Sequence, residues 1–308
     1  MNLIDKFKSY LKSKQYIELL IDRLHKKIEF DLYSVEMQRS ALCSNESGVT
    51  DELYCDYPLI VSLTTYGKRL NDVYLTIESI LRGTKKPNRI ILWLEESLEN
   101  ETLPDVLVRQ MNRGLEIRYT KNILSFKKII PTLKLCPSSI IVTIDDDVIY
   151  KFDMIERMFN SYLKEPKAIH ANRVHSMTFS SNKVLDSYNN WDWGIDKNSL
   201  SIYNFATGVG GILYPPNSLN NEVFNEKAFM ELCPYGDDIW LFAMGHLNGY
   251  YIKKVLTHDN HGYDYFENES VQDVGLNIKN TLNSNRNDIQ IKAVFEKYNI
   301  YNILNLKQ

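Results

Sequence analysis

An apolar run that stops abruptly on three acids constrains this chain most. Ile140 to Ile144 are all β-branched, and Asp145, Asp146 and Asp147 follow directly. β-branched residues favour strands, and a strand that is apolar on both faces is typical of a buried parallel sheet. Ligands of open α/β sheets bind beyond the carboxyl ends of the strands. The sequence therefore has three carboxylates at a position where a ligand is expected.

Adjacent carboxylates repel one another, so a positively charged partner is expected at this triplet. A divalent cation is the simplest candidate, because Mg²⁺ and Mn²⁺ prefer hard oxygen ligands and can bridge to a nucleotide diphosphate. The alternative is that one aspartate caps a helix starting near Lys151 while the others face water.

The residues before the triplet alternate between strand and helix patterns. Predicted strands cover 59–64, 89–94 and 115–119, and predicted helices cover 71–81, 104–113 and 126–135. This alternation predicts an α/β fold with a mostly parallel central sheet flanked by helices. The first strand and loop offer Thr64, Thr65, Tyr66 and Arg69 to a nucleotide, and Glu95, after the second strand, could accept hydrogen bonds from a base or ribose.

Composition narrows the functional classes. The chain has 308 residues, 12% of them aromatic, which is sufficient for a hydrophobic core. A net charge of −3 gives no basic surface of the kind that binds nucleic-acid polymers, so no such partner is expected. No apolar stretch reaches the roughly 18 residues of a membrane span, and the N-terminus lacks the apolar core of a signal peptide. A cytoplasmic location is therefore expected.

Residues 1–50 read as an amphipathic helical arm and a linker. Apolar residues recur at helical spacing from Leu3 to Ile28, with lysines between them. The arm could dock on the body or on a second copy of the chain, or it could lie at the inner face of a membrane as a peripheral contact. Protein contact is favoured, because Asp5, Glu18 and Asp22 dilute the positive charge.

The second half of the chain contains two further polar segments. Trp191 and Trp193 lie among Asn, Asp and Gly residues, so they could stack on a sugar ring, and packing as a lid on the body is an equal alternative. The glycines of 207–211 let backbone approach a ligand, but two prolines follow, which excludes a dinucleotide-binding fingerprint. Asp237 and Asp238 are expected at a helix N-terminus, where capping alone would explain them.

The order of these segments resembles the nucleotide-sugar glycosyltransferases of the GT-A fold, of the type that builds bacterial surface polysaccharides. The resemblance is carried by residues 61–66, the helical residues 75–81, Lys86-Pro87 with the strand 90–94, and Asp145-Asp146-Asp147 as the D-x-D motif. It runs from about Leu59 to Gly262. It implies a hexosyltransferase that acts in capsule, O-antigen or lipooligosaccharide synthesis.

The resemblance also implies roles for residues. The donor would be a nucleotide sugar, with a UDP-sugar as first choice, held by Mn²⁺ or Mg²⁺, and the acceptor a saccharide or a lipid-linked sugar. Asp145, Asp147 and His258 would bind the metal, and Asp238, positioned by Asp237, would act as the base of an inverting displacement. The donor would be contacted by the residues named above for the nucleotide and by Lys128, Asp145, Asp146, Gly210 and Gly211, and the acceptor by Trp191 and Trp193.

Two other functions stay open. A sugar-phosphate transferase of capsule synthesis would use the same donor but release a nucleoside monophosphate. A non-catalytic carbohydrate-binding protein on a degenerate transferase body would bind without turnover. The expected domains are the arm and linker (1–50), a GT-A-like catalytic domain (51–265) and a helical tail packing on it (266–308), with an N-cap expected at Asn287-Asp288.

Overall fold

The computed structural model describes residues 3–259, 263–268 and 285–307. Its centre is an eight-stranded sheet in the order β3-β2-β1-β4-β10-β6-β11-β8. Strands β10 and β8 run antiparallel to their neighbours, and the other six run in one direction. The strands of this sheet are β1 (Leu59–Thr64), β2 (Arg89–Glu95), β3 (Leu115–Thr120), β4 (Ile140–Thr143), β6 (Ala168–Ala171), β8 (Leu200–Ser201), β10 (Ile212–Tyr214) and β11 (Tyr251–Lys254).

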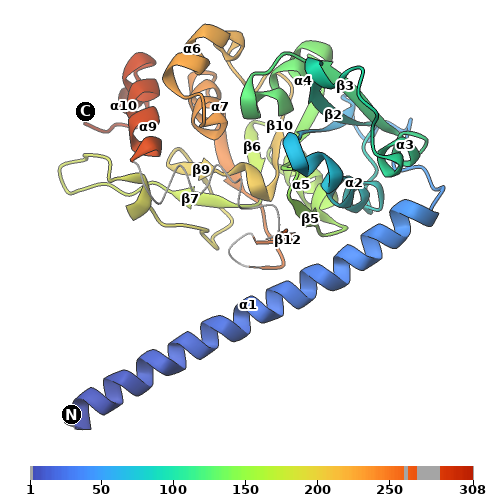
Figure 1. Ribbon diagram of the computed structural model, residues 1–308. Helices are drawn as coiled ribbons and strands as arrows, with labels where there is room; N and C mark the ends of the chain where they lie inside the picture. Colours follow the sequence, from blue (N-terminus) through green and yellow to red (C-terminus); the bar gives the residue numbers. More distant parts are fainter. Residues whose placement is uncertain (1–2, 260–262, 269–284, 308) are drawn as a thin grey trace.

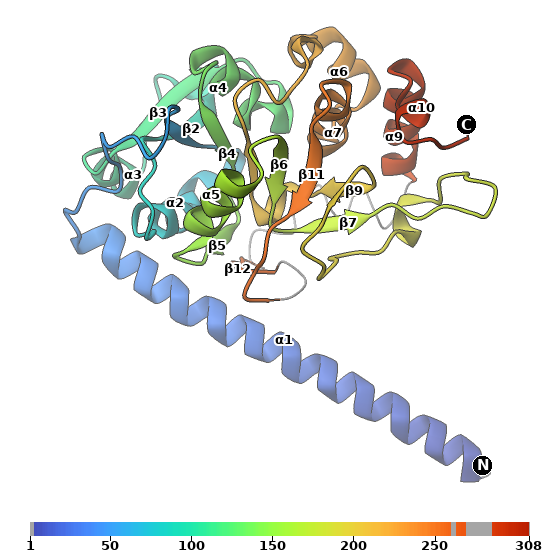
Figure 2. The ribbon, with the colours of Figure 1, turned by 180° about the vertical axis from the view of Figure 1, so that it is seen from behind.

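Helices cover this sheet and complete the predicted α/β architecture, which is confirmed (Figure 1). Helices α6, α7, α9 and α10 gather at one end of the molecule and α2 and α3 at the other, in both Figure 1 and Figure 2. The helices are α1 (Leu3–Cys43), α2 (Val73–Leu81), α3 (Asp105–Met111), α4 (Ile130–Leu135), α5 (Met154–Lys164), α6 (Glu226–Leu232), α7 (Asp237–Leu247), α9 (Arg286–Lys297) and α10 (Ile300–Ile303).

The central strands are apolar on both sides because both sides are covered. Alternate residues of β4 belong to different clusters: Ile140 and Val142 pack with α2 and α5, whereas Ile141 packs with Ile60 and Trp93 on the opposite face. All four residues of β4 are buried. The predicted interior strand is therefore confirmed, and its carboxyl end delivers the acid triplet to one edge of the sheet.

Two small sheets flank the carboxyl edge. One pairs β5 (Val148–Tyr150) with β12 (Tyr265–Glu267), and the other pairs β7 (Val174–Ser176) with β9 (Asn204–Ala206). The sequence patterns did not predict these pairings, because three-residue strands carry almost no periodicity. The expected domain boundary between 265 and 266 falls within β12.

Three local expectations differ from the structure. The predicted helix 126–135 is divided into a 3-10 helix (Leu124–Lys128) and α4, because Pro131 lies at the start of α4 and cannot donate a backbone hydrogen bond. Helix α5 begins at Met154, so none of the acids of the triplet caps it. The N-cap of α9 is Asn285, while Asp288 lies in the first turn and accepts hydrogen bonds from Ser187 and Tyr188.

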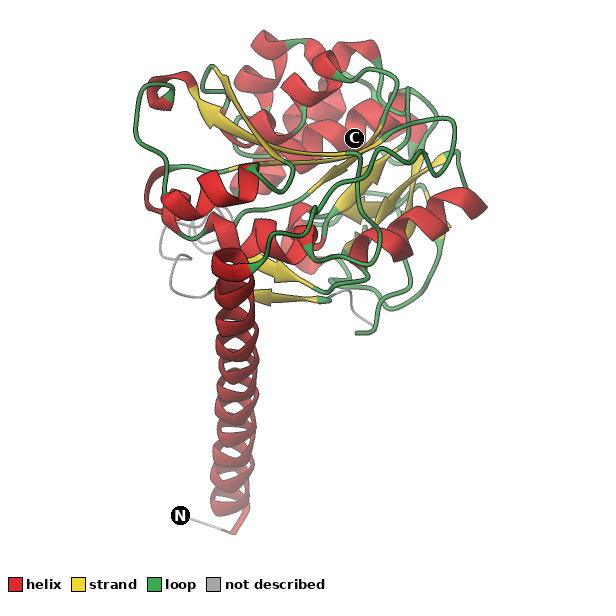
Figure 3. Cartoon of the chain, turned by 90° about the vertical axis from the view of Figure 1, so that its right-hand side faces the viewer, coloured by secondary structure: helices red, strands yellow, loops and turns green. Residues whose placement is uncertain are grey.

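The first helix differs from the rest in its position. Its C-terminal part contacts the body through Met37 and Ala41, and Tyr33 stacks on Phe266 with ring centroids 4.1 Å apart. Toward its N-terminus α1 extends away from the body in all three views (Figures 1, 2 and 3). None of the helices in the described part of the chain has the length and apolar character needed to cross a bilayer.

Candidate functional site

The structure brings the two acidic centres together on one lysine. Lys128 Nζ lies 2.8 Å from Asp145 Oδ1, which follows β4, and 3.0 Å from Asp237 Oδ2, at the start of α7. The ammonium group is almost completely enclosed. Burial alone would lower the pKa of Lys128, but Asp145, Asp237 and Asp238 hold it well above its usual value, so the side chain stays cationic. Residues about 90 positions apart thus form one site.

Arg69 pairs with the other two acids of the triplet, Asp146 and Asp147. Arg69 Nη1 donates to Asp146 Oδ1 at 2.8 Å, and its Nη2 lies 3.1 Å from Asp147 Oδ2. Thr65 Oγ1 also donates to Asp146, at 2.5 Å. Asp146 is therefore occupied by Arg69 and Thr65 and holds the loop after β1, so it is better placed to position Arg69 than to contact a ligand itself.

Asp147 lies in a strongly negative environment. Burial, and then repulsion from Asp145, raises the pKa of the Asp147 carboxyl to about 7, although Arg69 opposes the rise. Glu267 of β12 adds to the repulsion. The described site contains six carboxylates, Asp145, Asp146, Asp147, Asp237, Asp238 and Glu267, around Lys128 and Arg69. Its acids therefore exceed these two cations, and an additional positive charge would relieve the repulsion.

The donor atoms fit a hard divalent cation. Asp145 is 30% exposed and Asp147 is 15% exposed, so both carboxylates can be reached from outside. Carboxylate oxygens are the ligands that Mg²⁺ and Mn²⁺ prefer. Among the described residues, however, no group of three or more His, Cys, Asp and Glu side chains is already arranged around a common centre. Asp145 and Asp147 are the pair that could hold such an ion.

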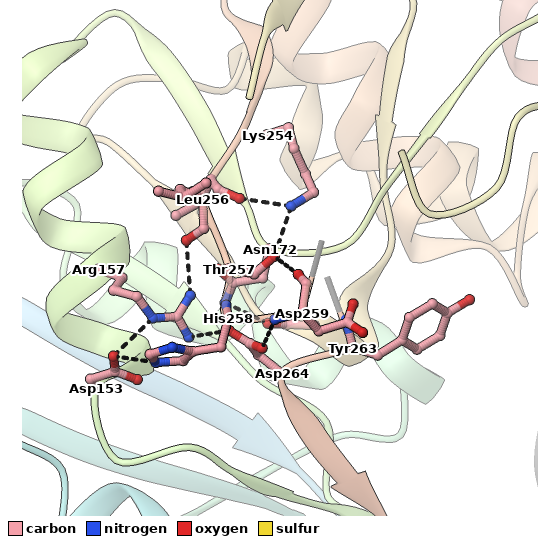
Figure 4. A network of polar contacts seen from close by, with 12 residues as sticks. Asp153, Arg157, Asn172, Lys254, Leu256, Thr257, His258, Asp259, Tyr263 and Asp264 are labelled. Atoms are coloured by element: carbon pink, nitrogen blue, oxygen red, sulfur yellow. Dashed lines mark hydrogen bonds and ion pairs between the residues drawn. The ribbon is translucent and has the colours of Figure 1, made fainter. Parts of the chain in front are cut away.

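His258 is directed elsewhere. Its Nε2 lies 2.7 Å from Asp153 Oδ2, and Arg157 contacts the same carboxylate (Figure 4). The backbone N–H of His258 donates to Asp264, which also pairs with Arg157. The expectation that His258 completes the metal shell is thus not supported by its contacts. It instead belongs to a network that fixes the loop after β11 against α5.

Asp238 has the environment of a potential proton acceptor. Its Oδ2 accepts the backbone N–H of Gly208 at 3.0 Å, while its Oδ1 is buried and has no hydrogen-bond partner among the described residues. Burial, and then the neighbouring Asp237, raises the pKa of Asp238 to about 7, with Lys128 opposing. The N-cap of α7 is Gly236, and Asp237 and Asp238 lie in the first turn, so neither acid is the capping residue. Capping alone does not explain the pair.

The glycine-rich segment contributes a different glycine from those expected. A Cβ atom on Gly208 would lie 2.8 Å from Lys128 Nζ and 3.3 Å from both Asp145 Oδ1 and Asp238 Oδ1. Gly208 therefore faces the carboxylates. Gly210 instead packs on Arg173, and Gly211, at φ +85°, faces Met154 of α5. These two glycines, which were predicted to contact the donor, therefore do not face the carboxylates as Gly208 does.

The two tryptophans separate into different roles. Trp191 is 4% exposed, lies within the core and donates from Nε1 to the Asp186 carbonyl, so the expectation of a sugar-stacking face is wrong for it. Trp193 is 43% exposed and stacks one face on His175, with centroids 4.9 Å apart. Only Trp193 retains a ring that a sugar could reach.

The remaining predicted contacts lie around the end of β1 and β2. The Thr64 hydroxyl donates to the Trp93 carbonyl and so joins the two strands. Tyr66 is 42% exposed, with the Arg69 guanidinium 5.3 Å from its ring centre. Glu95 ends β2 and is half-buried.

Sequence reasoning missed several residues of the site. Lys127 is 3% exposed, and burial lowers its pKa while Glu95 and Asp146 oppose the shift, so it lies near both acids. Tyr150 of β5 accepts the Asp145 N–H and donates to the Val209 carbonyl, which joins the triplet to the glycine segment. Their positions depend on tertiary contacts, and only the Lys127-Lys128 pair was visible in the sequence.

No protein-family model matches the chain, and no curated protein matches it. Among solved structures, a mannosyltransferase from Pyrobaculum calidifontis in complex with GDP-Man and Mn²⁺ is 13% identical, with 78% of this chain and 67% of that chain covered and a TM-score of 0.39. A CMP:2-keto-3-deoxy-manno-octonic acid synthetase complexed with CTP is 9% identical, with 66% and 90% covered and a TM-score of 0.35. Similarity this low leaves the function to be argued from the site.

Proposed function

We propose that the chain is a glycosyltransferase that uses a nucleotide-diphosphate sugar and a divalent metal ion. The observation that carries the proposal is the convergence of Asp145 and Asp237 on Lys128, with Asp238 alongside. A transferase needs charge stabilisation for a departing diphosphate and a base for the attacking hydroxyl. The site has carboxylates that could hold a metal ion for the first task and a partly buried acid for the second.

The metal would be held by Asp145 and Asp147, and when bound it would neutralise charge on the departing diphosphate. Arg69 and Lys128 keep these two carboxylates oriented, and Lys128 stays charged because three acids surround it. The donor nucleotide would lie over the loop after β1, near Tyr66 and Glu95. A UDP-sugar remains the first choice of donor.

Asp238 would accept the proton of the acceptor hydroxyl. Its oxygen Oδ1 has no hydrogen-bond partner among the described residues, and its raised pKa of about 7 suits proton transfer near neutral pH. Gly208 holds the other oxygen, so the carboxylate has a fixed orientation. These features favour an inverting displacement, in which a base faces the anomeric carbon. The proposed setting is the assembly of a bacterial surface polysaccharide, on a saccharide or lipid-linked acceptor.

Thermal unfolding against nucleotides tests the donor site. UDP, GDP and CMP are each added with and without Mn²⁺. A ligand at a hundred times its dissociation constant stabilises a protein by about 2.7 kcal/mol, so a shift of a few degrees is expected for one nucleoside diphosphate, and only with metal. Asp147→Asn should abolish the shift, whereas Asp51→Asn, at an exposed position, should not. No shift with any nucleotide would contradict the proposal.

Product analysis distinguishes the alternatives. With the stabilising nucleotide's sugar conjugate as donor, water or a simple saccharide as acceptor should yield the nucleoside diphosphate. Release of a nucleoside monophosphate would instead identify a sugar-phosphate transferase. Asp238→Asn should bind the donor normally and lose turnover. Binding without turnover in the unmodified protein across an acceptor panel would favour the carbohydrate-binding alternative.

A further inference from the structure

A partly buried guanidinium with no acidic partner among the described residues lies beside the candidate site. Arg173 follows β6, and its Nη1 donates to Thr207 Oγ1 at 2.9 Å. Its Nη2 lies 3.4 Å from the Tyr263 hydroxyl, and its guanidinium is 5.1 Å from the Tyr263 ring centre. Nε is buried and has no hydrogen-bond partner in the part of the chain that the structure describes. No carboxylate within the described ranges forms an ion pair with Arg173, and the ionisable groups that face it are Tyr265, Tyr263 and Tyr188.

A second unpartnered donor lies two residues further on. His175 is fully buried, and the Gly194 N–H donates to its Nδ1 at 3.1 Å. Burial, and then Arg173, lowers the pKa of His175 to about 3, so the imidazole is neutral and its proton is on Nε2. That Nε2 is buried without a partner among the described residues. Arg173 lies directly before β7, and its charge is one of the causes that lower the pKa of His175, so the two side chains are near each other.

Both groups adjoin the proposed reaction centre. Thr207, which Arg173 contacts, is followed directly by Gly208, and the Gly208 N–H donates to Asp238. The Tyr188 ring lies against His175 and Trp193, and burial followed by the charge of Asp238 raises the pKa of its hydroxyl. Arg173 and Tyr188 therefore lie near Asp238, and His175 and the exposed Trp193 pack beside Tyr188.

An isolated charge is costly to bury, so proteins pair such groups or use them to bind an opposite charge. A guanidinium matches the oxygens of a carboxylate or phosphate, and a neighbouring N–H donor adds to that match. Surrounding tyrosines and Trp193 would suit the apolar face of a sugar ring. In the proposed function, the donor diphosphate would be held by a metal ion at Asp145 and Asp147.

We propose that Arg173 binds an anionic group of the acceptor, so that the acceptor is an acidic saccharide or a sugar phosphate. That the anion belongs to an acceptor rests on the proposed function, whereas anion binding by Arg173 does not. The anionic oxygens could also come from the donor diphosphate. The two sources predict different behaviour of the nucleotide when Arg173 is changed.

Titration calorimetry with defined probes tests the inference. The probes are methyl glucuronide and glucose 1-phosphate, with methyl glucoside as the neutral control, each with and without the nucleotide and Mn²⁺. The anionic probes should bind and the neutral one should not. Arg173→Met should weaken anion binding about tenfold to a hundredfold, the range expected for a charged hydrogen bond. Arg173→Lys, which keeps the charge, should lose less, and Arg118→Gln, at a charged residue away from the site, should lose nothing.

Thermal unfolding of the free protein distinguishes ligand binding from a structural role. Removing a buried charge that has no counter-ion should leave the melting temperature of Arg173→Met equal to or above that of the unmodified protein. A large drop in melting temperature together with unchanged anion binding would overturn the inference. So would a loss of nucleotide diphosphate binding in Arg173→Met, because the anion would then be the donor's.

The outcome is separable from that of the proposed function. If a nucleotide with Mn²⁺ binds but neither anionic probe does, the transferase proposal stands and this inference fails. If the anionic probes bind through Arg173 while no nucleotide binds, the anion site stands and the transferase proposal fails.

Discussion

At the scale of single residues, Asp238 combines partial burial with a neighbouring like charge. Both effects disfavour its ionised form, and they raise its pKa from 3.8 to about 7. An ionised carboxylate in such an environment lowers the free energy of unfolding, which is common for side chains that take part in a reaction. The consequence is measurable even without a substrate.

We expect Asp238→Asn to be more stable than the unmodified protein, and only above about pH 4. Below the unfolded pKa of 3.8 the carboxyl is protonated in both states, so the two proteins should differ little. Between pH 4 and 7 the folded form retains a proton that the unfolded form has lost, so the unmodified protein loses stability as pH rises. At pH 8 the advantage of the variant should be full. Each pKa unit is worth about 1.4 kcal/mol, and partial solvent contact reduces the effect to about 1 to 3 kcal/mol.

Urea unfolding at pH 4, 6 and 8 measures this difference. Asp51→Asn, at an exposed position, provides the control and should differ from the unmodified protein by the same small amount at each pH. An Asp238→Asn variant whose stability difference does not change with pH would show that the carboxyl is not strained by burial.

At the scale of secondary-structure elements, a buried ion pair joins three helices. Glu78 of α2 is fully buried, and both of its carboxylate oxygens accept from Arg113 Nη1, at 2.9 and 2.7 Å. Gln110 of α3 donates to the same carboxylate at 3.0 Å, and Ser40 of α1 donates at 2.6 Å. This cluster attaches the end of α1 to the body.

Removing the negative charge of Glu78 alone should lower the free energy of unfolding. Glu78→Gln leaves the Arg113 guanidinium buried without a counter-ion, and loss of one partner of a buried pair typically costs about 3 to 5 kcal/mol. Urea unfolding measures the loss, with Glu99→Gln at an exposed position as the control. The double change Glu78→Met with Arg113→Met should recover part of it. A loss below about 1 kcal/mol in Glu78→Gln would mean that water reaches the pair.

A comparison of predicted and observed strands shows which parts of the fold the sequence could predict. The strands β1 to β4 were predicted to within one residue, because β-branched apolar runs bounded by turn residues are a strong local signal. The antiparallel insertion of β10 between β4 and β6 was not predicted, since strand order depends on contacts distant in sequence.

The same distinction applies to the site. Asp145, Asp147 and Asp238 could be proposed from their positions at the ends of predicted elements. The meeting of Asp145 and Asp237 at Lys128 could not, because the sequence does not reveal how α7 approaches β4. Gly208 could not be singled out beside the predicted Gly210 and Gly211 for a related reason: the side of the turn that faces the acids is set by the tertiary structure.

At the scale of the whole molecule, α1 is the helix whose exposed apolar residues the body does not cover. A helix of 41 residues is about 60 Å long, and the contacts to the body lie in its C-terminal part. Further toward the N-terminus its apolar residues are exposed, with Ile17 at 54%, Ile21 at 61%, Leu24 at 58% and Ile28 at 49%. The spacing of these four residues, at intervals of four, three and four, is that of a coiled-coil seam.

We expect this exposed seam to pair with the same helix of a second copy of the chain. A seam of a and d positions fits another helix, whereas a helix that lies on a membrane usually carries a broader apolar face and a strongly basic polar face. The acids Asp5, Glu18 and Asp22 among the lysines fit the first case better. Self-association should therefore depend on the seam and not on anionic lipid.

Sedimentation velocity decides between these cases. The unmodified chain should sediment as a dimer at micromolar concentrations, and Ile21→Asp should shift it toward monomer, because a charge in the seam cannot be desolvated without a partner. Lys27→Asp, an exposed change outside the seam, should remain dimeric. Both variants should keep the melting temperature of the body, since neither residue contacts it. A monomeric unmodified chain that instead binds vesicles containing phosphatidylserine would assign the helix to the membrane surface.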